Sequence, residues 1–395
     1  MKIRKAISSI LLCTVLAGCS SSGESHEIPL DQSSDCPVST IRTGIERQGI
    51  KTYGNGFECI DAGSYFMYNN GDSWLLYADH GSDTFIKLCG RPDCNHLDKD
   101  CNAFFKSAYN ICYYNDFLYT FDNDDNIIRI NLDGTERTSM YNISSFMKDK
   151  GYNGEFGMRI LNGIFFIDLT KVNESGSTVR DGYYYKLDGS MNEPQPVHSS
   201  SFEIVADGKT FIIPVYNKES GFYTYNIWDP DKGVGDELFK AEERLLRGYI
   251  GTKAEYHIED GVIIENSYTE GKKELINIGL KGNYQLACFP DCMVAYEYLS
   301  DDELNQGVTL DEVTFHFYDW KYNDLGSVKI NYKFRQEILN AGLICGETPE
   351  RIMLTDDYDF APRYYINKSD LGTGNIEIHP LNMPEDFPVY EKEED

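Results

Sequence analysis

Residues 128–134 read IRINLDG, and residues 183–189 read YYYKLDG. In both stretches a run of strand-forming residues ends in Leu-Asp-Gly, and the Asp-Gly pair favours a tight turn between two strands. Comparable strands lie near residues 85–90, 225–228 and 275–282, and weaker copies lie near residues 315–318 and 364–367. The unit returns at intervals of about 40 to 50 residues, which is the spacing of the four-stranded blades of a β-propeller.

Each unit also contains a turn that comes before an apolar run, as in Asn115-Asp116 before Phe117-Leu118-Tyr119. Seven copies begin near Gly63, Asp116, Gly163, Gly208, Gly261, Asp291 and Pro349. The sequence therefore predicts an all-β protein, a β-propeller of seven blades over residues 36–388. Six or eight blades are alternatives, and a pair of β-sandwiches is the structural runner-up.

The ends of the propeller are expected to meet. A strand at residues 39–47 is predicted to pair beside residues 375–379 and so to close the ring with one N-terminal and one C-terminal strand. Two short helices are predicted as excursions between strands, at residues 238–247 and 334–343. The acidic residues 389–395 are predicted to form a tail.

The first residues have the layout of an export signal. Lys2, Arg4 and Lys5 precede an apolar run at residues 7–16, and small residues lead up to Cys19. Crossing the membrane as a helix takes about 20 apolar residues, and this run has about half of them, so the segment is typical of a cleaved signal and not of a permanent anchor.

Residues 16–19 read Leu-Ala-Gly-Cys, which resembles the bacterial lipobox. The resemblance implies that residues 1–18 are removed and that Cys19 carries a diacylglycerol group. Residues 19–35 would then form a lipidated flexible linker, and the protein would lie on the outer face of the cell membrane, its membrane partner. The alternative is an ordinary secretory signal with an incidental cysteine.

The composition is strongly acidic. The formal net charge is −28, from 64 Asp and Glu against 36 Lys and Arg. Cleavage of the signal would make it more negative, and such a surface repels nucleic acid, so we expect no nucleic-acid partner. An apolar content of 41% supports a sizeable core, and a soluble acidic surface explains the charge without a cation-binding role.

One local cluster has the residue types of a metal site. Cys89, Cys94, His96 and Cys101 follow the spacing C-x4-C-x-H-x4-C directly after a predicted strand. Three thiols and one imidazole form the Cys3His ligand set of structural zinc, and a complete set of protein ligands leaves no position for a substrate. A disulfide with one thiol left over, or three unmodified thiols, are the alternatives.

The remaining cysteines do not settle that choice. Removing Cys13 and Cys19 from the 11 cysteines leaves an odd number, so complete intramolecular pairing is excluded. Cys288 and Cys292 stand in the sequence Cys-Phe-Pro-Asp-Cys and are interpreted as a disulfide, a second ligand pair or packing thiols.

Taken together, the lipobox, the Leu-Asp-Gly strand ends and the cysteine cluster resemble a group of Gram-positive surface lipoproteins. Their propellers are similar to those of TolB and the low-density lipoprotein receptor-related proteins. The resemblance covers most of the chain after Cys19 and implies a propeller on the cell surface. It implies no activity.

The sequence contains no nucleophile elbow, phosphate loop, dinucleotide fingerprint or HExxH helix. Our first functional hypothesis is a membrane-anchored binding or scaffold module for a protein, peptide or glycan. The second is an extracytoplasmic carbohydrate-active enzyme, a glycosidase or lyase with carboxylates in the propeller channel, since folding can bring two acids together without a local motif. The third is a surface protein that holds a metal through the Cys/His loop.

Overall fold

The computed structural model describes part of the chain. It covers residues 57–384 apart from 61, 71, 98, 107, 123, 175, 200–203, 208–209, 243–247, 280–281, 290, 301, 304–305, 309, 311, 332–343 and 356–360. All described residues belong to one compact unit, Pro37–Asp395. The predicted signal, Cys19, the linker, the strand at residues 39–47, the helix at residues 334–343 and the acidic tail lie outside the described residues.

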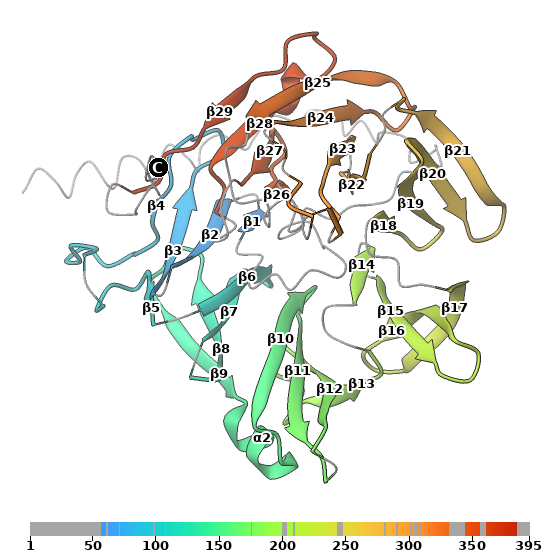
Figure 1. Ribbon diagram of the computed structural model, residues 1–395. Coiled ribbons are helices and arrows are strands. Elements are labelled where there is room, and N and C mark those ends of the chain that lie inside the picture. Colours follow the sequence, from blue (N-terminus) through green and yellow to red (C-terminus); the bar gives the residue numbers. More distant parts are fainter. Residues whose placement is uncertain are drawn as a thin grey trace, which may run out of the picture. The chain divides into compact units, whose positions relative to one another are not determined.

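The described strands form seven antiparallel sheets, which succeed one another around a ring (Figure 1). Blade 1 contains β1 (Phe57–Ile60), β2 (Gly63–Asn70), β3 (Asp72–Ala78) and β4 (Ile86–Lys87), with β5 (Phe104–Phe105) also paired to β3. Blade 2 contains β6 (Ala108–Tyr114), β7 (Phe117–Asp122), β8 (Asn126–Asn131) and β9 (Arg137–Asn142). Blade 3 contains β10 (Gly154–Leu161), β11 (Ile164–Val172), β12 (Thr178–Lys186) and β13 (Gln195–Val197).

Blade 4 contains β14 (Val205–Asp207), β15 (Thr210–Asn217), β16 (Phe222–Asp229) and β17 (Gly233–Ala241). Blade 5 contains β18 (Gly248–Ile250), β19 (Ala254–Glu259), β20 (Val262–Ser267) and β21 (Gly271–Asn277). Blade 6 contains β22 (Tyr284–Cys288), β23 (Met293–Glu297), β24 (Glu312–Tyr318) and β25 (Asp324–Asn331). Blade 7 contains β26 (Ile344–Glu347), β27 (Arg351–Leu354), β28 (Tyr364–Asn367) and β29 (Ile378–Pro380). The prediction of a seven-bladed all-β propeller is confirmed.

Each of the seven predicted turns falls in a different blade, but in one blade the turn lies at a different connection between strands. In six blades the predicted position falls at the connection between the first and second strands, as Asp116 does between β6 and β7. In blade 5 the turn at Gly261 joins the second and third strands, because the first strand, Gly248–Ile250, is short and carries no Asx-Gly turn of its own.

The side chains of a blade alternate between its two neighbours. Phe165 and Ile167 of β11 pack into a cluster with Phe121 of blade 2, whereas Phe166 packs with Trp228 of blade 4. Successive residues of a strand point to opposite faces of the sheet, and here both faces are covered. This is why the strands read as continuous apolar runs and not as an alternation of apolar and polar residues.

The first and last blades meet through side-chain packing. Phe57 of β1 packs with Met353 and Tyr365 of blade 7, and a side chain at Gly346 would lie 2.4 Å from the Phe57 ring. One parallel bridge, Thr84 to Asn382, joins the outer edges. All four described strands of blade 7 come from the C-terminal part of the chain, so pairing with residues 39–47 stays a prediction.

The predicted helix at residues 238–247 is wrong where the structure describes it. Residues 238–241 continue β17, and Phe239 stacks on Tyr225 of β16 with ring centroids 4.4 Å apart, so cross-strand aromatic packing prevails over helix propensity. A short helix that the sequence did not predict, α2 (Ser144–Lys150), joins blades 2 and 3. No helix among the described residues is both long and apolar enough to span a membrane.

The turn between β10 and β11 gives a test of the hairpin geometry. Asn162 and Gly163 both have positive φ, and a Cβ on Gly163 would lie 2.4 Å from the Tyr114 ring. Gly189 has the same φ, about +76°, with nothing within 4 Å. We expect Gly189→Ala to cost about 1 kcal/mol and Gly163→Ala about 1 to 3 kcal/mol more, measured by urea unfolding. Equal losses would show that the contact with Tyr114 is easily relieved.

Candidate metal centre

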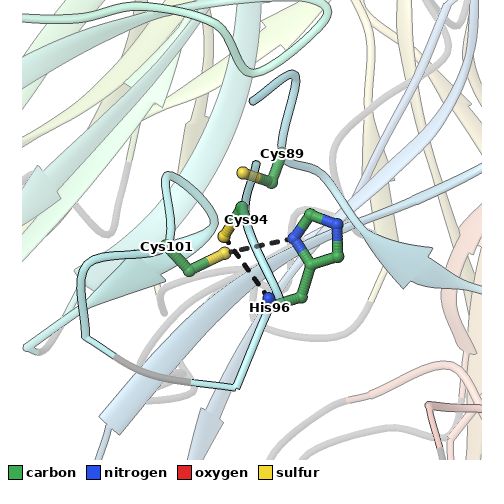
Figure 2. A group of neighbouring side chains, drawn as sticks. All are labelled: Cys89, Cys94, His96 and Cys101. Atoms are coloured by element: carbon green, nitrogen blue, oxygen red, sulfur yellow. Dashed lines mark hydrogen bonds between the residues drawn. The ribbon is translucent and has the colours of Figure 1, made fainter. Parts of the chain in front are cut away.

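The Cys/His cluster lies in a loop of blade 1, residues 88–103, between β4 and β5; this segment is called the metal loop below. One donor atom from each of Cys89, Cys94, His96 and Cys101 comes together, all within 4.8 Å of one another. Figure 2 shows the three sulfur atoms and the imidazole facing a common point. The Cys101 Sγ lies 3.6 Å from His96 Nδ1, and the His96 backbone N–H donates to Cys94 Sγ at 3.4 Å.

Backbone hydrogen bonds hold both ends of the metal loop to one residue of β3. The Leu88 N–H donates to the Leu75 carbonyl at 2.8 Å, and the Leu75 N–H donates to the Ala103 carbonyl at 2.8 Å. Within the loop, His96 adopts the left-handed conformation with φ of 60°, which reverses the chain between Cys94 and Cys101. The local fold therefore brings residues close in sequence to one point.

The cluster is partly shielded from solvent. Cys101 is fully buried beside Phe104, and Trp74 of β3 packs against the same group. Lys87 Nζ lies 4.0 Å from the centre of the Trp74 ring and donates to the His96 carbonyl at 2.7 Å. The loop is thus fixed by aromatic packing and by a cation as well as by its ends.

The thiols differ in acidity. Burial raises the pKa of the Cys101 thiol to about 12. Burial also acts on Cys89, but hydrogen bonds at the backbone of Arg91 and Asn102 and at the thiols of Cys94 and Cys101 outweigh it and lower the pKa of Cys89. Because a metal binds the thiolate, loading this site requires the release of protons, at Cys101 above all.

The donor set fits a soft or borderline divalent metal. Three thiols and one imidazole supply four ligands, which is the full complement of a tetrahedral zinc site with Zn–S near 2.3 Å. In such a site the sulfur atoms lie about 3.8 Å from one another. The donor atoms here lie within 4.8 Å of one another, which is compatible with that distance. Cys89, Cys94 and Cys101 are not joined in a disulfide. The cluster can hold a metal ion, as its sequence predicted.

The structure places Cys288 and Cys292 in different surroundings. Cys292 is buried in the apolar cluster between blades 6 and 7. Cys288, at the end of β22, packs on the cluster between blades 5 and 6. The two side chains therefore pack on opposite sides of their sheet, and the interpretation that suits this placement is packing thiols.

The structure contains a cluster of charged side chains that was not predicted from the sequence. Lys368 Nζ lies 2.5 Å from a Glu347 carboxylate oxygen and 3.1 Å from an Asp291 oxygen. The side chains of Lys368 and Glu347 are 11% and 3% exposed, so this is an interior ion pair. Asp291 lies in the connection between β22 and β23 of blade 6, Glu347 ends β26 of blade 7, and Lys368 directly follows β28 of the same blade. No local motif relates the three residues.

The other buried acids are also tied to individual partners. Glu58 accepts a hydrogen bond from the Tyr113 backbone N–H at 3.1 Å, and its burial raises its pKa well above the usual range. Asp168 lies 3.7 Å from Arg180, and Glu255 lies 3.2 Å from His257. Together with Glu347, these acids are spread over blades 1, 3, 5 and 7.

No family model matches the chain, and no curated protein matches its sequence. Comparison with solved structures finds distant similarities. An oligogalacturonate lyase from Vibrio parahaemolyticus is 11% identical, with 87% of this chain and 92% of the lyase covered and a TM-score of 0.41. A puromycin hydrolase is 9% identical, with 89% of this chain and 57% of the hydrolase covered and a TM-score of 0.45. The WD40 β-propeller domain of Doa1 is 10% identical, with 86% and 93% covered and a TM-score of 0.36. Likeness at this level concerns strand arrangement and transfers no activity.

Proposed function

We propose that this protein is a surface lipoprotein of the Gram-positive type, anchored by diacylglycerol on Cys19 to the outer face of the cell membrane. Its propeller acts as a non-catalytic module that binds a protein, peptide or glycan. Zinc at Cys89, Cys94, His96 and Cys101 stabilises blade 1. The lipobox supports the anchor, and the propeller supports the binding role, because the ring offers a broad rigid face built from many loops.

One observation argues against catalysis by a metal held in this loop. The group of metal-binding side chains found among the described residues supplies four protein ligands, and a metal held in this way has no open position for water or substrate. This is the arrangement of a structural site. Zinc bound here would supply crosslinking of the loop and no Lewis-acid step.

The metal loop also offers a surface for binding. Leu97 lies between two of the ligands, His96 and Cys101, and its side chain is 70% exposed. A large apolar side chain costs free energy when it is left in water. It is therefore a suitable contact for a partner.

The anchor is tested by growing cells that express the full chain in labelled palmitate. We expect label on the wild-type protein and on Cys13→Ser, and none on Cys19→Ser, which should also leave the membrane fraction. Cys13 is the matched control because it lies in the apolar part of the signal. Label retained by Cys19→Ser would exclude lipidation at this residue.

The binding role is tested with the purified protein from residue 20 onward on oligosaccharide and peptide arrays. Retention of an oligosaccharide or peptide whose mass is unchanged after incubation supports a binding module. Cleavage of the retained compound, seen as a change in its mass, would contradict the non-catalytic assignment and support the carbohydrate-active enzyme or another hydrolase.

A further inference from the structure

The metal loop contacts blade 2 as well as blade 1. Asn102 follows the ligand Cys101, and its side-chain amide donates to the carbonyls of Gly134 and Thr135, both at 2.9 Å. Gly134 and Thr135 belong to the turn between β8 and β9, in the Leu-Asp-Gly unit that repeats along the chain. The contacts between the metal loop and this turn are called the seam below.

The backbones at the seam approach closely. A Cβ on Gly134 would lie 2.7 Å from the Leu88 carbonyl oxygen, and a Cβ on Gly90 would lie 2.7 Å from the Asp133 carbonyl oxygen. Such distances leave no space for a side chain on either loop. The turn and the metal loop therefore form one packed unit, in which displacement of one requires displacement of the other.

Arg137 of β9 adds a charge from the blade 2 side. Its guanidinium donates to the Phe104 carbonyl and lies 4.7 Å from the centre of the Phe105 ring. Arg137 also interacts electrostatically with Cys101 and Cys89. Zn²⁺ with three thiolates and a neutral imidazole has a net charge of about −1, so the loaded site is complemented by this arginine.

We propose that metal bound at the Cys/His cluster fastens blade 1 to blade 2 through Asn102 and Arg137. The inference rests on the proposed zinc site. Metal orders the loop, the ordered loop presents Asn102 to the turn, and the docked turn in return holds Cys101 in its ligating position. Because binding free energies are reciprocal, loosening the seam must weaken metal binding, and removing the metal must loosen the seam.

The first arm of the test measures zinc affinity by competition with a chromophoric chelator. Asn102→Ala is expected to bind zinc about 10-fold more weakly than the wild type, which is the usual cost of losing a group that supports a ligand. The matched control is Asn375→Ala, which removes an exposed asparagine of blade 7 that hydrogen bonds Glu377. Its zinc affinity should equal that of the wild type.

The second arm measures hydrogen exchange of the unmodified protein with zinc and after chelation. The Gly134 N–H bonds the Asn131 carbonyl, and the Thr135 N–H bonds Asp133, so both amides report on the turn. We expect their exchange to accelerate about 10-fold on zinc removal. The equivalent Leu-Asp-Gly-Ser turn of blade 3, at residues 187–190, has no metal loop and should not change.

The outcomes separate the two claims. A wild-type protein that takes up no zinc would contradict the proposed metal site. A protein that binds zinc, but whose affinity is unchanged in Asn102→Ala and whose turn at residues 133–135 exchanges equally with and without metal, would overturn the fastening role and leave the metal site standing.

Discussion

Cys101→Ser should abolish tight zinc binding and remove the effect of zinc on the stability of the propeller. Cys101 is the fully buried ligand, and a serine hydroxyl is a poor substitute for a thiolate. A metal that binds only the folded state stabilises it by about 4 kcal/mol when free metal exceeds the dissociation constant 1,000-fold. In thermal unfolding, a chelator should therefore lower the midpoint of the wild type. It should leave the midpoint of the variant unchanged.

Cys112→Ser is the matched control for this substitution. Cys112 is a buried thiol of blade 2 that does not belong to the metal-binding group, so its replacement should lower stability but keep the response to zinc. Native mass spectrometry of the wild type measures the same property directly. If the protein carries no zinc and its mass is lower than that of the fully reduced chain by two hydrogen atoms, a disulfide has formed instead. The zinc assignment would then be wrong.

Lys368→Met should destabilise the junction of blades 6 and 7 by about 3 to 5 kcal/mol, because it leaves the buried Glu347 carboxylate without a positive partner. Chemical unfolding at neutral pH measures the loss. Lys329→Met is the control, since Lys329 and Glu312 form an exposed pair, 67% and 50% exposed, and little change is expected. A double variant, Lys368→Met with Glu347→Gln, should recover part of the stability.

The same pair gives a pH dependence with a definite sign. Burial lowers the pKa of Lys368, but the charges and hydrogen bonds of Glu347 and Asp291 outweigh it and raise the pKa above the ordinary value of 10.5. A raised pKa means that the contribution is complete below the unfolded value and is lost as pH rises through the folded value. The stability gap between wild type and Lys368→Met should therefore persist through neutral pH and narrow only in strongly alkaline solution.

The ring was predictable because its signals are local and repeated. An Asx-Gly pair such as Asn162-Gly163 fixes a hairpin by its own backbone preference, whatever lies around it. Strand length carries no such signal, and this is why the short strand Gly248–Ile250 shifted the predicted position in blade 5. The helix predicted at residues 238–247 is wrong over residues 238–241 for a related reason, since the partner that holds Phe239 in a strand is supplied by a neighbouring strand.

The metal centre and the charge cluster differ in the same way: the first is encoded locally in the sequence, and the second is formed only by tertiary packing. The four ligands of the metal loop lie within one short segment, so their types and spacing were enough to predict that they converge. Glu347, Lys368 and Asp291 are brought together only when blades 6 and 7 pack, and each alone reads as an ordinary surface charge. The contacts of Asn102 could not be predicted from the sequence either, because they are made to a turn that belongs to the next blade.

Both faces of the sheet that contains β11 are buried, and this restricts where residues can be inserted into or deleted from the chain. Deleting one sheet would uncover the apolar faces of its two neighbours, and either deleting or duplicating a sheet would force all the others to adjust their angles around the axis. Insertions between strands carry no such penalty. The helix α2 and the segment holding the three thiols and the imidazole both lie in such connections, where a change of sequence or length leaves the ring itself in place.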